Sequence, residues 1–233
     1  MKLSPNWYYS EIKQVGIDYS DIQEVQAYDL RMQKIRDIQK ETENAKAAIN
    51  LNKSHSLLEI GTGTGEFAVE ISRHCKKVYA IDISPAMIEV ARKKAKLQRR
   101  DNIEFFHAGF LSYQHQGEPL DAVVSQLVLH HLPDFWKFLA LKRIFQMLRK
   151  GGKFYLRDVV FPSVDDYVSF FNQLIDKIRL SAGEEIAAEV EIHIREEYST
   201  LDWIMEDLLI RTGFKIEQAD YYDEFLAVYV CTK

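Results

Sequence analysis

Short apolar runs alternate with amphipathic stretches through the middle of the sequence. The apolar runs cover residues 56–60, 78–82, 103–106, 122–126 and 153–159, and the helical patterns between them cover about 66–74, 84–95 and 133–148. Apolar runs of this length are typical of buried strands, and strands that alternate with helices form a parallel, doubly wound sheet. The sequence therefore predicts an α/β fold, with Gly151-Gly152 ending the third helix.

The alternation stops after Pro162. Two helical stretches, about 164–181 and 184–192, follow one another with no strand predicted after them, and a last helix is predicted to be capped by Ser199 and ended by Gly213. Three residues separate the apolar runs 214–221 and 225–231, which is too few for a crossover connection. We therefore expect a seven-stranded sheet, parallel except for one antiparallel strand supplied by a C-terminal hairpin.

The first fifty residues predict a helical cap. Ser4-Pro5 is typical of a helix start, with Gly16 ending that helix, and Ser20 opens a capping box. From Ile22 to about Asn50 the apolar residues recur at helical intervals. We expect a cap over residues 1–53 and a main domain over 54–233, with a helical insertion at about 162–198 that acts as a lid.

Composition limits the class of protein. The 233 residues, 47% of them hydrophobic, are enough for one core. No apolar run approaches the roughly 20 residues that cross a bilayer, and the N-terminus lacks an apolar signal segment. The only cysteines, Cys75 and Cys231, lack metal-ligand spacing. We expect a cytoplasmic protein with no membrane span, no disulfide framework and no metal site.

Charge is unevenly distributed along the chain. Residues 160–233 carry 6 basic and 16 acidic side chains, whereas residues 54–159 carry 16 basic and 11 acidic ones. An acidic C-terminal region repels a phosphate backbone, which disfavours nucleic acid as the partner. The basic cluster at 92–100 is interpreted as the solvated face of a helix.

The loop after the first strand contains glycines at 61, 63 and 65. Glycines let a ligand approach the backbone, and the next helix offers unpaired N–H groups. The dinucleotide fingerprint needs a third glycine where Glu66 stands, and a carboxylate there opposes a pyrophosphate. Asp82, at the end of the second strand, is placed to accept hydrogen bonds from ribose hydroxyls.

A nucleoside site without a phosphate cradle, and with an acid at Glu59, points to a cationic nucleoside such as S-adenosylmethionine. Two structural alternatives stay open at this point. The glycines also suit a simple strand-to-helix turn, and Asp82 also suits a turn or a helix N-cap before Ser84.

Several segments resemble the class I S-adenosylmethionine-dependent methyltransferases, in particular the small-molecule type related to the ubiquinone and menaquinone biosynthesis enzymes. They are 58–65, 80–84, 129–133, 148–153 and the terminal hairpin, and the resemblance covers about residues 25 to 232. It implies a Rossmann-like fold, S-adenosylmethionine as cofactor, S-adenosylhomocysteine as product and a methyl-transfer activity.

The resemblance also implies cofactor contacts. Loop residues 61–63 hold the methionine portion, with Glu59 near its ammonium group, and Asp82 holds the ribose. The full implied set is Tyr28, Glu59, Gly61, Thr62, Gly63, Asp82, Ile83, Met87, Gly109, Phe110 and Gln126. One position departs from the family, which often has an aspartate for the adenine amino group where this chain has Gly109.

Three residues are candidates for the acceptor side: His130, His131 and Asp158. Histidines suit proton transfer, and Asp158 ends a strand at the ligand edge of the sheet. Structural or cofactor-contact roles are the alternative for the histidines, and an ion pair with Arg157 is the alternative for Asp158. A roof over the acceptor, or simple core packing, is expected of Tyr167, Phe170, Phe171, His193 and Arg195.

We therefore expect an enzyme that transfers the methyl group of S-adenosylmethionine to O, N, S or C of a small molecule by in-line displacement. The alternatives are a methyltransferase acting on RNA or protein, and a regulator that binds the cofactor without turnover. A nicotinamide dehydrogenase is the remaining alternative, disfavoured by Glu66.

Overall fold

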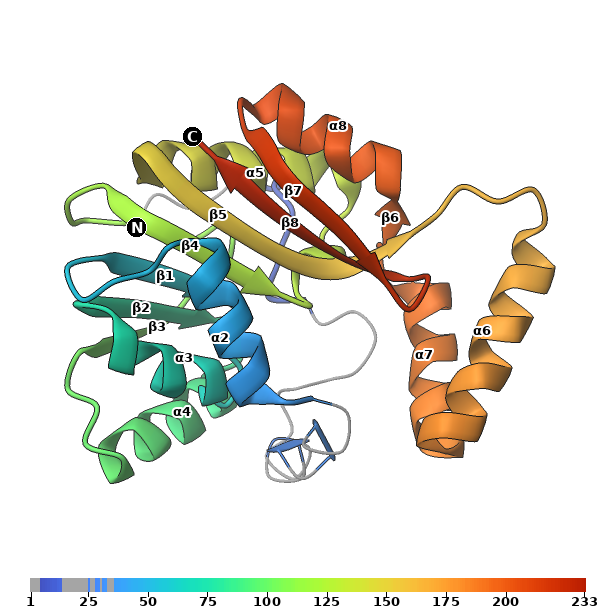
Figure 1. Ribbon diagram of the computed structural model, residues 1–233, viewed down its shortest axis with the longest axis horizontal. Coiled ribbons are helices and arrows are strands. Elements are labelled where there is room, and N and C mark those ends of the chain that lie inside the picture. The colour runs from blue at the N-terminus through green and yellow to red at the C-terminus, as the bar shows by residue number, and fades with distance from the viewer. Residues whose placement is uncertain (1–4, 14–24, 26–27, 30, 33–35) are drawn as a thin grey trace.

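The computed structural model describes residues 5–13, 25, 28–29, 31–32 and 36–233 (Figure 1). The strands are β1 (Ser56–Ile60), β2 (Lys77–Asp82), β3 (Ile103–His107), β4 (Leu120–Gln126), β5 (Leu148–Phe161), β6 (Thr200–Leu201), β7 (Lys215–Tyr222) and β8 (Leu226–Thr232). The helices are α2 (Ile38–Ala48), α3 (Glu66–Ile71), α4 (Pro85–Leu97), α5 (Asp134–Met147), α6 (Tyr167–Ala182), α7 (Glu184–Glu196) and α8 (Asp202–Thr212).

The strand order is β3-β2-β1-β4-β5-β8-β7. Strands β1 to β5 pair in parallel, and β8 pairs antiparallel with both β5 and β7. The Rossmann-like, doubly wound sheet with one antiparallel strand is therefore confirmed. The prediction of no strand after the two inserted helices is wrong, because β6 pairs in parallel with the end of β5. Two residues are too few to show a strand periodicity.

Both faces of the central strands are buried. Leu57 and Leu58 are adjacent and fully buried, yet they belong to separate hydrophobic clusters because successive strand side chains point to opposite faces. Figure 1 shows α2, α3 and α4 over one face and α5 and α8 over the other. This two-sided cover explains why the strands appear in the sequence as continuous apolar runs.

Gly65 allows the close packing of α3 against α4. Its φ is +80°, and a Cβ at this position would lie 2.7 Å from the Cβ of Ala91. Gly151 and Gly152 have a different role from the predicted one. Helix α5 ends at Met147, and both glycines lie within β5, near a register irregularity in its pairing with β4.

The N-terminal cap differs from the prediction. Residues 5–13 form turns instead of a helix, and the capping box at Ser20 lies outside the described residues. Arg36 and Asp37 are not helical, so the expected helix to Asn50 is interrupted there. Asp37 caps α2, its side chain accepting a hydrogen bond from the Lys40 amide at 3.0 Å. Aspartate at an N-cap explains the break.

Helices α6 and α7 form a hairpin beyond the ends of the strands (Figure 1). The predicted N-cap of α8 is wrong, because Ser199 Oγ lies 2.7 Å from His193 Nε2 and Leu201 occupies the cap position. Gly213 ends α8 as predicted, with a φ of +109°. Across the described residues, no helix has the length and apolar character needed to span a membrane.

Candidate functional site

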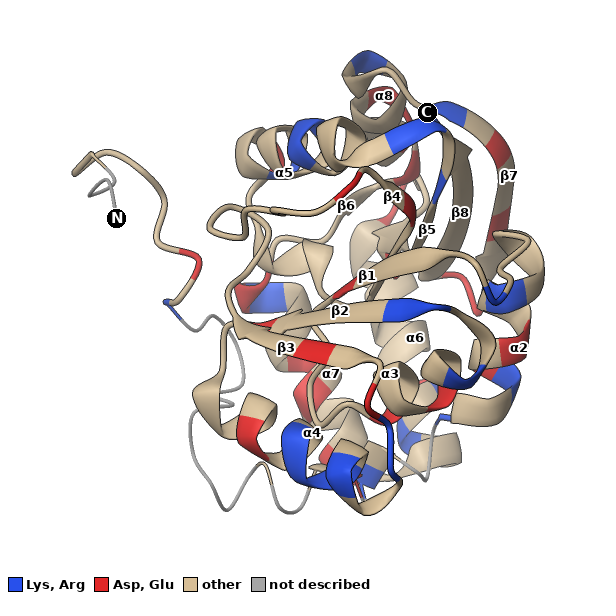
Figure 2. Cartoon of the chain, turned by 90° about the vertical axis from the view of Figure 1, so that its left-hand side faces the viewer, with Lys and Arg blue, Asp and Glu red and all other residues tan. Residues whose placement is uncertain are grey.

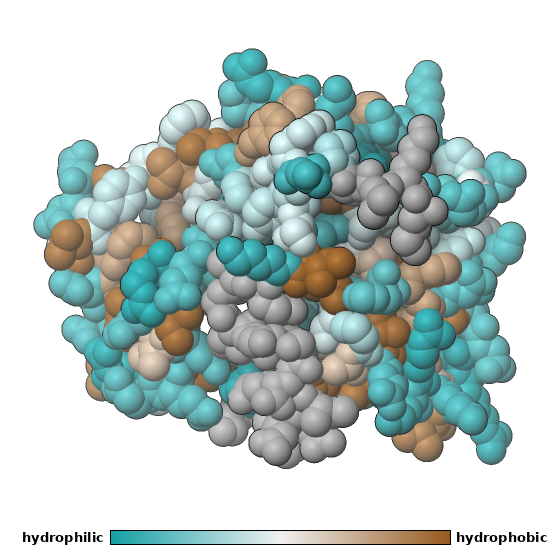
Figure 3. All heavy atoms as spheres, turned by 180° about the vertical axis from the view of Figure 1, so that it is seen from behind, coloured by the Kyte–Doolittle hydropathy of each residue, from teal (hydrophilic) through white to brown (hydrophobic). Residues whose placement is uncertain are grey.

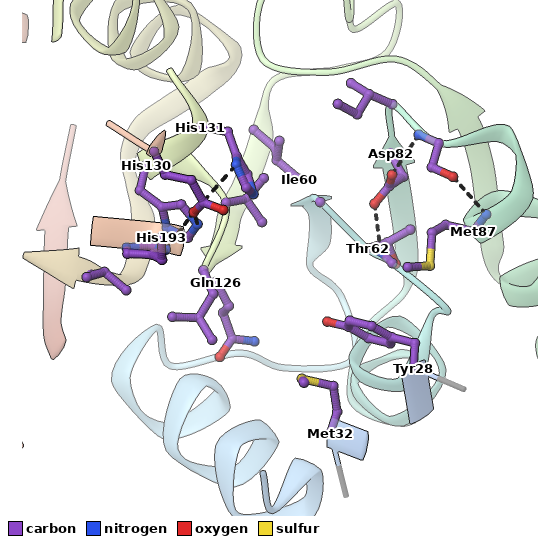
Figure 4. Close-up of a pocket in the computed structure, with 18 of the residues that line it drawn as sticks. Tyr28, Met32, Ile60, Thr62, Asp82, Met87, Gln126, His130, His131 and His193 are labelled. Carbon is purple, nitrogen blue, oxygen red and sulfur yellow. Dashed lines mark hydrogen bonds and ion pairs between the residues drawn. The ribbon is translucent and has the colours of Figure 1, made fainter. Parts of the chain in front are cut away.

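One cavity of about 370 Å³ lies at the carboxyl ends of the central strands. Its walls come from the N-terminal segment, the glycine loop, the ends of β2 and β4, and α7. In Figure 4, His130, His131 and His193 gather on one side, and Asp82, Met87 and Tyr28 lie on the other. All eleven residues predicted to contact the cofactor line this cavity.

Asp82 joins the second strand to the glycine loop. Its Oδ2 accepts a hydrogen bond from the Gly63 amide at 2.8 Å, and its Oδ1 accepts one from the Ser84 amide at 2.8 Å. Ser84 is the N-cap of α4, since its Oγ accepts from the Met87 amide at 3.2 Å. Burial raises the pKa of Asp82 against these donors. Ser84, and not Asp82, is therefore the N-cap of α4.

Gly61 brings the loop against the segment after β4. Its φ is +78°, and a Cβ here would lie 2.2 Å from Val128 Cγ2. A Cβ at Gly63 would meet nothing within 4 Å, although its φ is also positive. The loop thus has bare backbone facing open space at Gly63, which suits the close approach of a ligand.

Glu59 and Arg36 place a carboxyl group and a guanidinium in the same cavity. Glu59 is buried, and Thr62 Oγ1 donates a hydrogen bond to its Oε2 at 2.7 Å. Burial raises the pKa of Glu59 to about 8, opposed by the Thr62 hydrogen bond and the charge of Arg36. The Arg36 guanidinium is anchored by Glu41. An acid beside a guanidinium fits a zwitterionic amino-acid group.

Gln126 ends β4 with a buried amide in the cavity wall. Neither its Oε1 nor its Nε2 has a hydrogen-bond partner among the residues that the structure describes. Buried amides are normally paired, so two unpaired atoms facing a cavity indicate that a polar ligand completes them. An open amide donor and acceptor at this position are compatible with a polar group such as the methionine portion of S-adenosylmethionine.

Asp29 ties the helical segment that carries Tyr28 to the glycine loop. Its Oδ1 accepts a hydrogen bond from Thr64 Oγ1 at 2.5 Å, and its Oδ2 lies 2.7 Å from Lys94 Nζ. Lys94 also pairs with Glu66. The prediction that the basic cluster at 92–100 is a solvated face is therefore wrong for Lys94, which pairs with Asp29 and Glu66 beside the glycine loop.

Glu11 is a residue that the sequence analysis missed. Its carboxylate accepts hydrogen bonds from the amides of Leu111 and Ser112, both at 2.8 Å. A Cβ at Gly109 would lie 2.5 Å from Glu11 Oε2. The carboxylate thus stands beside the position where the family often has its aspartate. No sequence pattern could have found it, because a hundred residues separate Glu11 from its partners.

A buried ion cluster forms the opposite wall. His130 Nδ1 lies 2.5 Å from Asp158 Oδ1, and the His130 amide donates to Asp158 Oδ2 at 3.0 Å. On its other side, His130 Nε2 lies 3.2 Å from Glu197 Oε2. Burial acts to lower the pKa of His130, but Asp158 and Glu197 outweigh it and raise the pKa to about 9. Asp158 is fully buried and does not line the cavity.

Two more histidines approach the same Glu197 oxygen. His131 Nδ1 lies 3.8 Å and His193 Nδ1 lies 2.5 Å from Glu197 Oε2. Burial and the charge of His130 lower the pKa of His131 to about 4. Burial acts to raise the pKa of Glu197, but His130 and His193 outweigh it and lower the pKa. Glu197 was not predicted from the sequence, where its one signal is the i,i+4 spacing from His193.

The expected aromatic roof packs elsewhere. The Phe171 ring stacks on Tyr167 and meets Phe161 and Phe170 edge-to-face, with ring centroids 5.0 to 6.1 Å apart. The three aromatic residues of α6 do not line the cavity, and Arg195 contacts its neighbour Glu196. Tyr167 is exposed and Phe170 and Phe171 are half-buried outside both hydrophobic clusters, so neither the roof nor core packing describes them. The wall is supplied instead by α7 and its C-cap, through Ile186, Glu189, Val190, His193, Ile194 and Glu197.

Comparison with known proteins identifies the family. Residues 57–152 match the methyltransferase domain family. An uncharacterized methyltransferase of Geobacillus kaustophilus is 32% identical over 158 residues, which cover 68% of this chain and 68% of that protein. The uncharacterized methyltransferase YrrT of Bacillus subtilis is 31% identical, with 69% of this chain and 70% of that protein covered.

Solved structures share the fold. The N-methyltransferase NodS of Bradyrhizobium japonicum, solved with S-adenosyl-L-homocysteine, is 17% identical with a TM-score of 0.59, covering 84% of this chain and 86% of that one. A SAM-dependent methyltransferase of Aquifex aeolicus is 18% identical with a TM-score of 0.61, covering 91% and 97%. Together, the fold, the cavity and the sequence relatives show that this chain belongs to the class I S-adenosylmethionine-dependent methyltransferases.

Proposed function

We propose that this methyltransferase acts on a small molecule that enters the same cavity as the cofactor. One observation carries the proposal. The cavity of about 370 Å³ is bounded both by the predicted cofactor residues and, across from them, by the histidine cluster and α7. That volume is typical of small-ligand sites, which run from roughly 300 to 1,000 Å³. An acceptor held within these walls is a small molecule.

We infer the cofactor contacts from the residues that line the cavity. Glu59 pairs with the ammonium of the methionine portion and Arg36 with its carboxylate. Asp82 accepts hydrogen bonds from the ribose hydroxyls, since each of its oxygens has a second lone pair. Gln126 completes its amide hydrogen bonds on the methionine portion. The remaining contacts are assigned to Tyr28, Gly61, Thr62, Gly63, Ile83, Met87, Gly109 and Phe110.

The bound sulfonium supplies a reactive methyl group, so the chain's own task is to position the acceptor and to exclude water. Loop residues 61–63 set one side of the cavity, and His130 and His131 set the other. Asp158 acts through His130, which it orients by two hydrogen bonds. Helices α6 and α7 serve as the lid of a domain that spans 54–233, with residues 1–53 as its cap.

Charge supports a small acceptor over RNA. The lid and the C-terminal region lie within residues 160–233, which hold 16 acidic and 6 basic side chains. Figure 2 shows Lys and Arg gathered on α4, on the outside of the molecule. The wall of the cavity includes Glu189 and Glu197. These acidic side chains disfavour the entry of a phosphate backbone bound along α4.

The test uses S-adenosylmethionine labelled in its methyl group. Cell extract is desalted, and the small molecules removed in that step are then added back. The protein is incubated with this mixture, and the methyl label is measured separately in small molecules, RNA and protein. We expect label in small molecules alone. Label in RNA or protein would overturn the proposal, and binding of S-adenosylhomocysteine without transfer in many extracts would favour a regulator. A matched reaction with Asp82→Ala controls for enzymes already present in the extract.

A further inference from the structure

Three side chains on the acceptor wall bring together a ligand set typical of metal sites. One donor atom from each of His130, His131 and Glu197 lies within 4.8 Å of the other two. Glu197 Oε2 is 3.2 Å from His130 Nε2 and 3.8 Å from His131 Nδ1. Two histidines and one carboxylate, with positions left open, are a recurrent set in catalytic zinc sites and non-haem iron sites.

The glutamate oxygen at the centre lacks a hydrogen bond. The Glu197 side chain is only 7% exposed, and its Oε2 has no hydrogen-bond partner among the described residues. Nitrogens of His130, His131 and His193 nevertheless lie within 4 Å of it. Three imidazole nitrogens therefore converge on one carboxylate oxygen at the cavity wall. A cation at this position is placed to contact Glu197, His130 and His131 together.

The surroundings hold the ligands in place, as in known metal centres. His130 faces Glu197 through Nε2 while its Nδ1 contacts Asp158 at 2.5 Å, which is the carboxylate–histidine pairing that orients metal ligands. The Tyr198 amide donates to the His130 carbonyl oxygen at 2.9 Å. The buried Lys137 contacts Asp134 and the Tyr198 carbonyl oxygen. These contacts fix Glu197 next to His130 through the backbone.

We propose that His130, His131 and Glu197 bind one divalent transition-metal ion. Two imidazoles favour Zn²⁺, Fe²⁺ or Co²⁺ over Mg²⁺ or Ca²⁺, which prefer all-oxygen sites. The three ligands all line the cavity, so the open positions of the ion face the space proposed for the acceptor. His193, beside Glu197, is a positioning residue for that carboxylate.

The role of the ion rests on the proposed function and narrows its substrate class. An acceptor with a hydroxyl or thiol group binds the open position, and the ion lowers the pKa of that group. The proton leaves to water, an electron pair of the oxygen or sulfur forms the bond to the methyl carbon, and the C–S bond of the sulfonium breaks to give S-adenosylhomocysteine. The acceptor is therefore an oxygen or sulfur nucleophile.

Metal binding is tested on the full chain after treatment with a chelator and dialysis. Co²⁺ is titrated with detection of its visible absorption bands, Zn²⁺ is titrated by competition for the bound Co²⁺, and Mg²⁺ serves as a comparison. We expect one Co²⁺ per chain with micromolar or tighter affinity, displaced by Zn²⁺ and not by Mg²⁺. Glu197→Gln and His131→Ala are each expected to weaken binding by about 100-fold or more, and Asp158→Asn by about tenfold to 100-fold.

The control variant is His74→Ala, because His74 also lies near a glutamate, Glu43, but outside the cavity. Its metal affinity is expected to match that of the wild type. Absence of Co²⁺ and Zn²⁺ binding would overturn the metal site, as would binding that both Glu197→Gln and His131→Ala retain. Circular dichroism checks folding of each variant. Binding of S-adenosylhomocysteine is measured separately, so failure of the cofactor assignment is distinguished from failure of the metal site.

Discussion

Glu59 is a cavity residue whose charge depends on whether a ligand is bound. Burial raises its pKa to about 8 despite the nearby Arg36, so near neutral pH its carboxyl group is mostly protonated in the absence of ligand. The ammonium group of a bound cofactor stabilises the carboxylate form. Binding below pH 8 is therefore expected to release a proton from Glu59.

This linkage predicts that affinity for S-adenosylhomocysteine rises with pH. Between pH 6 and a pH near 8 the increase approaches about tenfold per pH unit at most, because one proton is lost on binding. Calorimetry in phosphate and in Tris, whose ionisation enthalpies differ, measures the proton directly.

Glu59→Gln is the matched control, since the amide keeps the shape and cannot ionise. It is expected to bind more weakly and to show neither the pH trend nor the buffer dependence that the wild type shows. Equal affinity of the wild type at pH 6 and pH 8, with the same enthalpy in both buffers, would contradict the assignment of Glu59.

At the scale of elements, the N-terminal segment 5–13 completes a site built by the sheet. In this segment, the Glu11 carboxylate accepts hydrogen bonds from the amides of Leu111 and Ser112, beside Gly109. The adenine amino group is a donor that needs an acceptor, and Gly109 has no side chain to supply one. We infer that the Glu11 carboxylate supplies it.

Glu11→Ala is therefore expected to weaken S-adenosylhomocysteine binding by about tenfold, as for loss of a hydrogen bond to a charged group. The specific readout is S-inosylhomocysteine, which lacks the amino group. Wild type should prefer the adenosyl compound, and the variant should lose that preference. Ile12→Ala is the control from the same segment, because Ile12 is 60% exposed. A variant that binds both compounds more weakly but keeps the preference would show a structural role only.

Elements with strong local patterns were predictable. The buried strands, the Ser84-Pro85 start of α4 and the end of α8 at Gly213 each rest on neighbouring residues, and the structure confirms them. The predictions were wrong where contacts between distant segments determine the local structure. The two-residue β6 exists only through its pairing with β5, and Gly151-Gly152 lies in a strand whose backbone there exchanges hydrogen bonds with the distant Lys233.

The same division applies to the candidate site. The glycine loop and Asp82 could be identified because the sheet topology brings strand ends to one edge. Glu11 and Glu197 could not, because turns and an inserted helix deliver them across long sequence separations. Asp158 was predicted at the end of its strand, but β5 continues to Phe161, and the structure shows that Asp158 contacts His130 and does not line the cavity.

At the scale of the whole molecule, the cavity lies between the carboxyl ends of the central strands and the helical hairpin of α6 and α7. Hydrophobic residues on the rear face are scattered among hydrophilic ones (Figure 3). The central strands pair through continuous parallel ladders, so the glycine loop and the end of β4 are held at a fixed separation. The cofactor wall and the acceptor wall therefore face one another across a single space.

The most direct measurement is an isothermal titration of the purified protein with S-adenosylhomocysteine, compared with Asp82→Ala. Wild type is expected to bind one molecule with micromolar affinity, and the variant at least about tenfold more weakly because the ribose loses its acceptor. Reduced nicotinamide cofactor is expected not to bind. Absence of S-adenosylhomocysteine binding, or equal affinity in wild type and variant, would contradict the placement of the cofactor in this cavity.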